Sequence, residues 1–332
     1  MNKFTFKNIV QLFKETGKGF IQDDIPKLSA SLAYYTIFSI GPMLIVVLFI
    51  ANIIWRKEAL EGRLFGQIKH LVADEVAYQI QEIIKNAAVQ GNNKMTALIG
   101  LVTLIIAATT VFSEIQDSIN SIWKLKVKTN VGWFKTIKTR ILSFSLVIGL
   151  GFLLLVSLII NGLVEGLMDR LKEIFPEMTI IILYIINLII TTSVTSALFA
   201  IIFKVLPDAL IEWKDVWVGA VFTAILFMVG RMGIALYIGN SAIASAYGTA
   251  GSFVVLLLWI YFSSIILYFG AEFTKCYAVL FGSEILPGKY AFLFHIVQLE
   301  SKKETVQENE NEVKVIKEEI KTEKPNGEDT IK

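Results

Sequence analysis

Long apolar runs separated by short polar links dominate this chain of 332 residues. Six runs are expected to be membrane spans, at about residues 32–54, 96–119, 141–164, 179–203, 216–239 and 252–275. Each holds at least the ~20 residues that a helix needs to cross a hydrocarbon core about 30 Å thick. The pattern predicts an all-α fold, a polytopic bundle of six transmembrane helices within residues 29–277.

Amphipathic segments flank the first span. Residues 1–28 mix lysines with apolar residues at helical spacing, which predicts a cytoplasmic surface helix. This helix either lies on an anionic membrane surface or packs on the end of the bundle. Residues 55–95 have the apolar spacing of surface helices but are too polar to span, so an extracytoplasmic helical insert is expected there.

Two further signals mark where elements begin and end. Asp23 and Asp24 followed by Pro26 favour a helix start, because aspartate caps helix N-termini and proline fits the first turn. Residues 278–332 are expected to form a cytoplasmic, mostly disordered charged tail. Most of that tail is too polar to bury the apolar area that would offset the entropy lost on ordering.

The lysines and arginines of the short links set the expected orientation. The link at residues 120–140 holds six of them and no acid, whereas residues 165–178 hold two against four acids. Basic links stay on the cytoplasmic side, so both termini are expected to be cytoplasmic. Arg56, Lys57 and Lys94 lie at the opposite ends of the first two spans and argue against this orientation.

Polar residues inside three spans are candidates for a permeation pathway. Those of the first span include Pro42, which removes a backbone hydrogen bond and is expected to kink the helix. Those of the fourth span follow at i, i+4 and i+8, and the fifth span contains one arginine. The candidates are Tyr34, Tyr35, Ser39, Pro42, Asn187, Thr191, Thr195 and Arg231. The alternatives are a packing kink, hydrogen bonds between helices, and an arginine that snorkels outward as an anchor.

A second polar cluster is expected at the cytoplasmic ends of the spans. Glu114, Asp117 and Asn120 follow one another at i, i+3 and i+6 on one helix face, and Glu272 precedes Lys275 by three residues. The alternative is that the acids only pair with nearby lysines. Counted along the helices, Arg231 and Glu272 lie at different depths, so no direct ion pair between them is expected.

Composition narrows the class of protein. The chain is 55% hydrophobic and 18% charged, with a mean hydropathy of +0.62, as expected of a polytopic membrane protein. A net charge of +2 gives no sign of nucleic-acid binding. Cys276 is the single cysteine, and His70 and His295 are far apart in sequence. We therefore expect no disulfide, metal site or cofactor. The expected partners are the lipid bilayer and a small solute or ion, and the oligomeric state is left open.

Four stretches resemble a known family. They are DDIPKLSASLAYYTIFSIGPMLIVV, Asn120-Ser121-Ile122-Trp123, Leu206-Pro207-Asp208 and YGTAGSFVVLLLWIYFSSIILYFGAEFT. Together they are similar to the YihY/virulence factor BrkB family of bacterial membrane proteins, also labelled ribonuclease BN-like. The resemblance covers residues 23–277 and implies a six-helix protein of the bacterial plasma (inner) membrane. The labels in use for the family are transport, envelope-related roles and nuclease activity.

Three candidate functions are consistent with a protein of this class. The first is a transporter or permeation pathway for a small solute or ion, and the second is a noncatalytic scaffold of the envelope. The third, a nuclease, needs convergent carboxylates or histidines, and Glu114 and Asp117 form the only close acidic pair beside a span. We therefore expect that the protein is not an enzyme.

Overall fold

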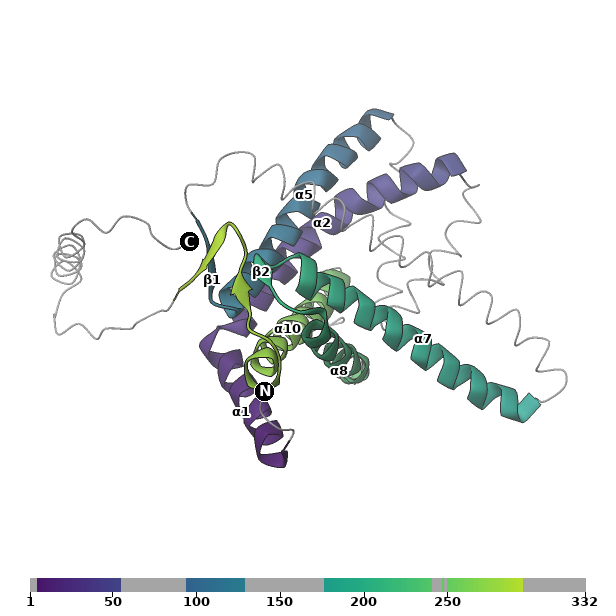
Figure 1. Ribbon diagram of the computed structural model, residues 1–332. Coiled ribbons are helices and arrows are strands. Elements are labelled where there is room, and N and C mark those ends of the chain that lie inside the picture. The colour runs from purple at the N-terminus through teal and green to yellow at the C-terminus, as the bar shows by residue number, and fades with distance from the viewer. Residues whose placement is uncertain (1–4, 55–93, 129–175, 241–246, 248–249, 295–332) are drawn as a thin grey trace, which may run out of the picture. The chain divides into compact units, whose positions relative to one another are not determined.

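The computed structural model describes residues 5–54, 94–128, 176–240, 247 and 250–294. The third expected span, most of the expected insert and the chain beyond residue 294 lie outside the described residues. The described part is predominantly helical (Figure 1).

The described elements are long helices and a few very short strands. The helices are α1 (Phe6–Gln22), α2 (Ile25–Ile54), α5 (Lys94–Ile122), α7 (Pro176–Val205), α8 (Trp213–Asn240) and α10 (Gly251–Phe281). The strands are β1 (Leu125–Val127), β2 (Ala209–Leu210), β3 (Leu286–Pro287) and β4 (Ala291–Leu293). Among the described residues, three helical segments are long and apolar enough to cross a membrane, judged by length and composition: Ile185–Val205, Trp213–Ile238 and Phe253–Phe281.

The turn between α1 and α2 follows the aspartate and proline signal. α2 begins at Ile25 with Pro26 in its first turn, so the predicted helix start is confirmed. Asp24 has a left-handed backbone (φ 51°), which aspartate tolerates better than most residues. Its carbonyl accepts hydrogen bonds from the amides of Lys27 (2.8 Å) and Leu28 (3.1 Å), which starts α2 in a new direction.

Helices α8 and α10 approach closely through small residues. A Cβ atom added to Gly219 would overlap the side chain of Thr274, and one added to Gly270 would overlap Thr223. Both threonine hydroxyls donate to a carbonyl four residues earlier in their own helix, at 2.7 Å. Each helix therefore places one glycine against a threonine of the other helix, and each threonine hydroxyl is bonded within its own helix. This arrangement permits close packing of the two backbones.

Helix α10 is the centre of the described fold. It packs against α1, α2, α5 and α8, while α2 also packs against α5, and α7 packs against α8. The main buried core lies where these helices meet, and its largest members are Tyr268, Phe203, Ile25, Ile119, Ile122 and Leu206. A second core joins α2, α8 and α10 further along, around Ile37, Ile234 and Trp259.

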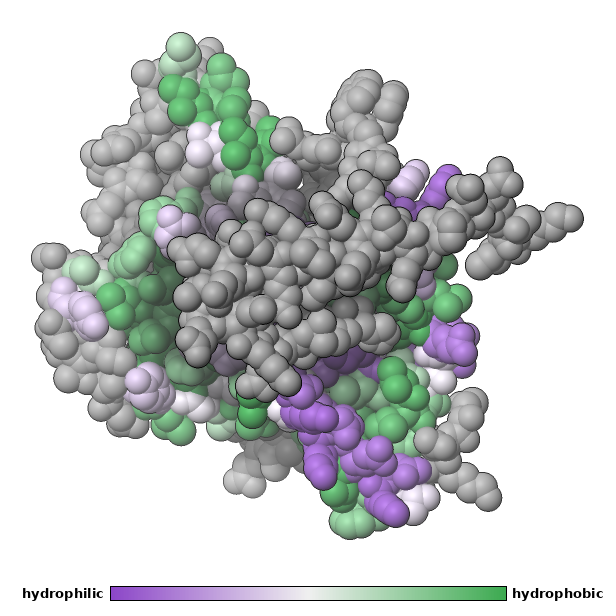
Figure 2. All heavy atoms as spheres, turned by 90° about the vertical axis from the view of Figure 1, so that its left-hand side faces the viewer, coloured by the Kyte–Doolittle hydropathy of each residue, from purple (hydrophilic) through white to green (hydrophobic). Residues whose placement is uncertain are grey.

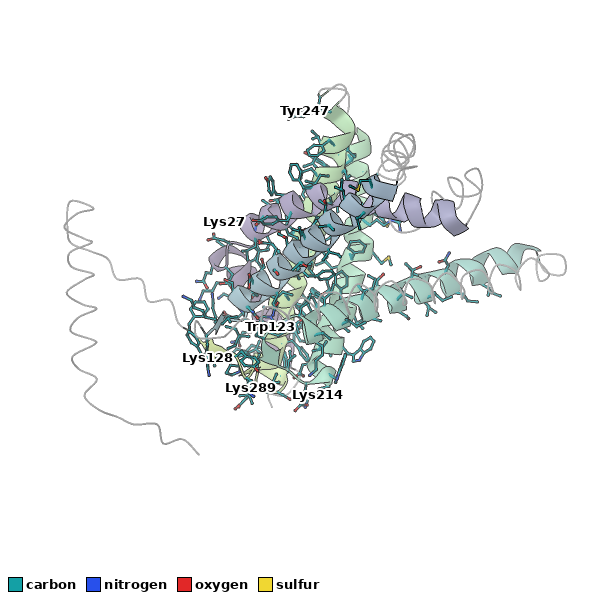
Figure 3. The ribbon with its side chains drawn as sticks, turned by 90° about the horizontal axis from the view of Figure 1, so that it is seen from above. Lys27, Trp123, Lys128, Lys214, Tyr247 and Lys289 are labelled. Carbon is teal, nitrogen blue, oxygen red and sulfur yellow. The ribbon has the colours of Figure 1, made fainter. Side chains whose placement is uncertain are left out.

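One end of the helices carries the short strands. β1 pairs with β4 and β2 with β3, both antiparallel, so the chain after α10 returns to the segments that follow α5 and α7. Lys128, Lys214 and Lys289 lie at this end and Tyr247 lies at the opposite one (Figure 3). We call it the polar end: α5, α7 and α10 finish there, and α2 and α8 begin there.

The expected tail boundary at residue 278 differs from the structure. α10 continues to Phe281, and residues 286–293 form β3 and β4. Such short strands carry too few residues for an alternating sequence pattern, so they could not be foreseen.

Candidate functional site

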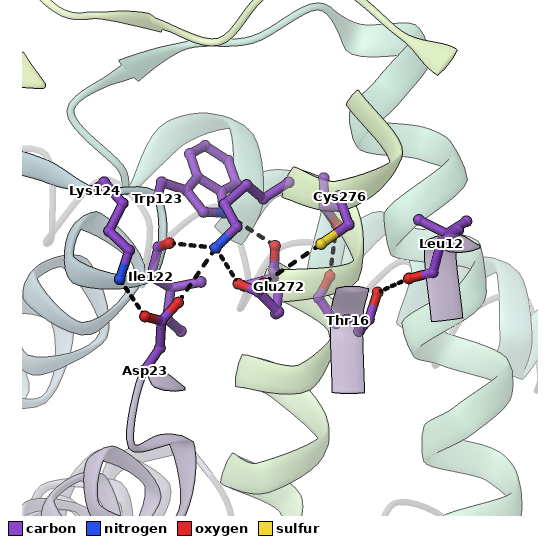
Figure 4. Close-up of polar contacts among 12 residues, drawn as sticks. Leu12, Thr16, Asp23, Ile122, Trp123, Lys124, Glu272 and Cys276 are labelled. Atoms are coloured by element: carbon purple, nitrogen blue, oxygen red, sulfur yellow. Dashed lines mark hydrogen bonds and ion pairs between the residues drawn. The ribbon is translucent and has the colours of Figure 1, made fainter. Parts of the chain in front are cut away.

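A network of four charges joins three segments at the polar end (Figure 4). Asp23 caps the C-terminus of α1, and its side chain is only 3% exposed. Its carboxylate forms ion pairs with Lys124, which follows α5, and with Lys275 of α10, whose Nζ lies 3.3 Å away. Asp23 thus connects the α1–α2 turn to two helices that are distant in sequence.

Lys275 is the centre of this network. Its Nζ atom donates to the carbonyl oxygen of Ile122 at 2.8 Å and lies 2.5 Å from Oε2 of Glu272, one turn earlier on α10. The other carboxylate oxygen of Glu272 accepts a hydrogen bond from the Cys276 thiol at 3.4 Å. All four charges are therefore compensated within the network.

Local backbone features bring these side chains together. Gly19 of α1 lies directly against Glu272, and a Cβ atom there would overlap the carboxylate. Lys124 has a left-handed backbone (φ 56°), which ends α5 beside the α1–α2 turn. The indole nitrogen of Trp123 donates to the carbonyl of Ala271 at 3.0 Å, which fixes the end of α5 against α10.

A pocket of about 370 Å³ lies beside the network, between α1 and α10. Its lining residues are Gln11, Glu15, Gly19, Gln22, Asp23, Lys124, Glu272, Lys275, Cys276, Val279 and Leu280. Among the described lining residues, Glu15 is the only charged one outside the network, so their formal net charge is −1. Carboxylate and amide acceptors beside lysine donors suit water or a small polar molecule.

A second set of hydrogen bonds joins α5 to the link after α7. Asp208 accepts from the side-chain amides of Gln116 (2.9 Å) and Asn120 (3.1 Å) through the same carboxylate oxygen. The backbone amide of Asp208 donates in return to Oδ1 of Asn120 at 2.9 Å. This reciprocal pairing fixes the position of the α7–α8 link on the end of α5.

A third contact at the polar end joins the start of α8 to the segment after α10. Asp215, in the first turn of α8, is 1% exposed and accepts a hydrogen bond from the backbone amide of Ser283 at 2.8 Å. The segment after α10 is thereby attached to the start of α8.

Comparison with known proteins identifies the family of this chain. A family model described as virulence factor BrkB matches residues 16–284. The chain belongs to this family. The matched region begins in α1 and ends just after α10, so it includes all three contacts at the polar end of this BrkB-family protein. The family resemblance seen in the sequence is confirmed.

Relatives of this BrkB-family chain are bacterial membrane proteins. A UPF0761 membrane protein of Tolumonas auensis is 27% identical over 259 residues, which cover 76% of this chain and 80% of the relative. UPF0761 membrane proteins of Psychrobacter sp. and Ralstonia nicotianae are 25% and 24% identical, over 81% and 75% of this chain. The chain spans only 48% and 55% of these two longer relatives. No solved structure matches it.

The expected cytoplasmic cluster is divided between two networks in this BrkB-family protein. Asn120 pairs with Asp208, and Glu272 pairs with Lys275. Glu114 is partly buried and Asp117 is exposed. Sequence reasoning missed Asp23, Lys124 and Asp208 as members of this site. Asp208 stands in the Leu-Pro-Asp link that carries the family resemblance, and this was the available signal.

Two of the pathway candidates of α2 are exposed tyrosines. Tyr34 and Tyr35 are 58% and 38% exposed, and their rings meet edge to face with centroids 5.6 Å apart. Ser39 donates to the carbonyl of Thr36 at 2.7 Å. Pro42 lies within α2, which continues past it to Ile54, and its side chain lies outside the described residues.

The candidates of α7 and α8 are spread over two neighbouring helices. Asn187 is exposed and accepts a hydrogen bond from Thr191 at 3.1 Å. Thr195 on α7 and Arg231 on α8 are partly buried. Within the part of the chain that the structure describes, no group of three or more His, Cys, Asp and Glu residues could hold a metal ion.

Proposed function

We propose that this BrkB-family protein is a multi-pass protein of the bacterial inner membrane that forms a permeation pathway, or transporter, for a small polar solute or ion. The proposal has three supports: the order of the helices, a polar group within the apolar segment of α7, and a network of buried charges at the polar end.

The order of the helices supports six crossings. Both α5 and α7 finish at the polar end, so we propose one further crossing between them. The apolar run at residues 141–164 is long enough for this crossing. Together with α2, α5, α7, α8 and α10 it makes six. The lysines at the polar end favour a cytoplasmic location for that end and for both termini.

The position and hydrogen bonding of Asn187 are the main support for the proposed pathway. It lies 11 residues after Pro176 and 18 residues before Val205, which is about 17 Å and 27 Å along the helix axis. An amide at this depth is costly in hydrocarbon unless its donors are bonded. Among the described residues, the Asn187 side chain has one hydrogen bond, in which its oxygen accepts from Thr191. We propose that its two N–H groups, for which the described residues show no acceptor, bond to water or to a polar solute.

Other hydroxyls in the helices need no such partner. Thr103 donates to the carbonyl of Ile99 at 2.8 Å, and Thr109 donates to Ile105 at 2.7 Å. Bonds of this kind satisfy a threonine within its own helix. Thr191 instead donates to a side chain, so the pair it forms with Asn187 presents a polar surface on α7.

The polar end corresponds to the closed end of the pathway. The network of Asp23, Lys124, Lys275 and Glu272 and the pair of Asn120 with Asp208 join α5, α10 and both helix links there. A solute that enters from the opposite side would stop at this end until these contacts open.

Flux into liposomes tests the proposal. The full-length protein is reconstituted and challenged with a panel of ions and small osmolytes. We expect uptake above that of empty liposomes, with Asn187→Leu and Thr191→Leu reducing it. Thr103→Leu is the matched control, because its hydroxyl is bonded within α5. The proposal is rejected if no solute enters faster than in empty liposomes, or if the control variant reduces flux equally.

A noncatalytic scaffold is the second candidate. Leu286, Phe292 and Leu293 on β3 and β4 are 50%, 41% and 52% exposed, and they form apolar positions beside the polar end that a partner protein could cover. In that case the reconstituted protein passes no solute, and replacing Phe292 and Leu293 with serine abolishes association with the partner while leaving the fold intact.

A further inference from the structure

Helix α1 has an apolar face that the rest of the described chain leaves uncovered. One side of the helix packs on α10 through Leu12, Thr16 and Gly19. A neighbouring side exposes large apolar side chains. These are Phe6 (82% exposed), Ile9 (40%), Val10 (51%), Phe13 (49%) and Ile21 (74%). At 100° per residue they fall within about 120° of the helix circumference, so they form one stripe.

The stripe continues the apolar outer surface of α8. The ring of Phe13 lies 5.9 Å from that of Phe222 on α8 and 5.8 Å from that of Phe273 on α10. Val218, one turn before Phe222, and Val221, directly before it, are exposed on α8, inside a segment apolar enough to cross a membrane. Surfaces of this kind face acyl chains. The α1 stripe is thus continuous with a surface whose composition suits lipid rather than water.

Tryptophans indicate the depth of the stripe. Trp213 and Trp217 are 50% and 44% exposed at the start of α8. Tryptophan is enriched at the level of the lipid headgroups. Phe222, which contacts the stripe, follows Trp217 by five residues. Helix α1 is thus at the boundary between headgroups and acyl chains.

Three exposed lysines follow the edge of the stripe. Lys7, Lys14 and Lys18 fall within about 40° of one another on the helix, on the side of the stripe away from α10. Glu15, the only acid in α1, lines the pocket on the next side. Figure 2 shows hydrophilic and hydrophobic side chains next to one another low on the molecule, at the height of α1 in Figure 1.

We infer that α1 is an in-plane membrane helix whose apolar stripe enters the acyl chains and whose lysines bind the phosphate groups of anionic phospholipids. An apolar face with lysines at its edge is the pattern of interfacial helices, and lysines near an anionic surface add electrostatic attraction. The inference depends on a membrane location and not on solute transport, so the flux assay and the tests below can fail independently.

Fluorescent labelling tests the position of the stripe. In full-length Cys276→Ser protein, a single cysteine is placed at Val10, and the resulting thiol is labelled with an environment-sensitive dye in nanodiscs that contain phosphatidylglycerol. The matched control carries the dye at Gln11, which lines the pocket. We expect lipid-borne nitroxide to quench the dye at position 10 and aqueous iodide to quench the dye at position 11. Iodide quenching of both dyes would overturn the inference, as would formation of a disulfide-linked dimer when the unlabelled Val10→Cys protein is treated with an oxidant.

Lipid retention tests the lysines. Each lysine near an anionic surface contributes about fivefold to binding. The triple variant Lys7→Gln, Lys14→Gln, Lys18→Gln should therefore lower the ratio of phosphatidylglycerol to phosphatidylcholine that co-purifies from mixed vesicles by about tenfold or more. The control triple changes the exposed Lys126, Lys128 and Lys289 to glutamine. An equal loss in the control, an unchanged ratio, or displacement of the lipid by inorganic phosphate would overturn the inference.

Discussion

Asp23 and Lys275 form an ion pair across 252 positions of the chain, with the carboxylate almost fully buried. The same carboxylate binds Lys124, and the same ammonium binds Glu272 and a carbonyl of α5. Removing charges from water costs free energy that only good geometry and full pairing recover. The network therefore fixes which segments meet at the polar end, and the loss of one member leaves its neighbours buried and uncompensated.

Replacing Asp23 with asparagine should destabilise the protein. The change keeps the shape of the side chain but removes the charge that compensates Lys124 and Lys275. We expect a loss of about 3 kcal/mol, at the low end for a broken buried pair because Lys124 remains 39% exposed. Thermal unfolding in detergent measures this loss of stability. Asp24→Asn is the control: Asp24 is exposed and left-handed, a backbone that asparagine also tolerates. Equal Tm values for the two variants would contradict the proposed role of Asp23.

Two glycines of α1 should respond to alanine in opposite directions. At Gly19 the added methyl group overlaps the Glu272 carboxylate, so α1 and α10 must move apart and stability falls by about 1–3 kcal/mol. At Gly17 no atom lies within 4 Å of the added Cβ atom. Alanine there gains roughly 0.5–1 kcal/mol from its higher helix propensity. The two variants serve as controls for each other. Changes in Tm of the same sign in both variants would contradict the packing of α1 against α10.

Asn120→Ala should release the α7–α8 link from α5. The variant loses one hydrogen bond to the Asp208 carboxylate and one from its amide, at a cost of about 1–3 kcal/mol. Protease cleavage near Asp208 is the measurement, and it should become faster than in the parent protein. Ser121→Ala, at the neighbouring exposed position, should leave the rate unchanged.

Weakening the charge network should raise solute flux if the polar end is the closed end. Lys124→Gln removes one of the two cations that hold Asp23. Every 1 kcal/mol lost by the closed state raises the open fraction about fivefold, so a severalfold increase in uptake is expected. Lys27→Gln, an exposed lysine at the start of α2, should not change uptake. A lower flux in Lys124→Gln would argue that the network assembles the pathway instead of closing it.

The exposed pair of Glu212 and Lys214 should contribute little. The two side chains are 58% and 55% exposed, and their charges lie 2.8 Å apart. The hydrogen bond from Lys214 lowers the pKa of Glu212, so any stabilisation is present above the usual carboxylate pKa and is lost as the pH falls. Solvent screens such pairs. Glu212→Gln should therefore keep the parental Tm at pH 7, in contrast to Asp23→Asn.

Local sequence signals found the helices but not the contacts between their ends. Run length and hydropathy predicted α7, α8 and α10, because crossing a membrane requires both. Asp23 was interpreted as a helix start because it precedes Pro26. Its carboxylate instead pairs with lysines 101 and 252 positions away, and helical spacing contains no information on such distances.

The acidic face of α5 shows a second reason why the sequence did not predict the contacts at the polar end. Positions i, i+3 and i+6 drift by about 60° per step around a helix. Glu114, Asp117 and Asn120 therefore cover about a third of the circumference and meet different surroundings. Asn120 reaches Asp208, because the chain after α7 passes that side of the helix.

The residues just beyond α10 matter for how this protein can be engineered. β3 and β4 each pair with a segment that lies far away in the sequence, and Ser283 bonds to Asp215. Fusion tags or stop codons inserted before residue 294 would consequently disturb the loops after α5 and α7 as well as the end of the chain that was edited.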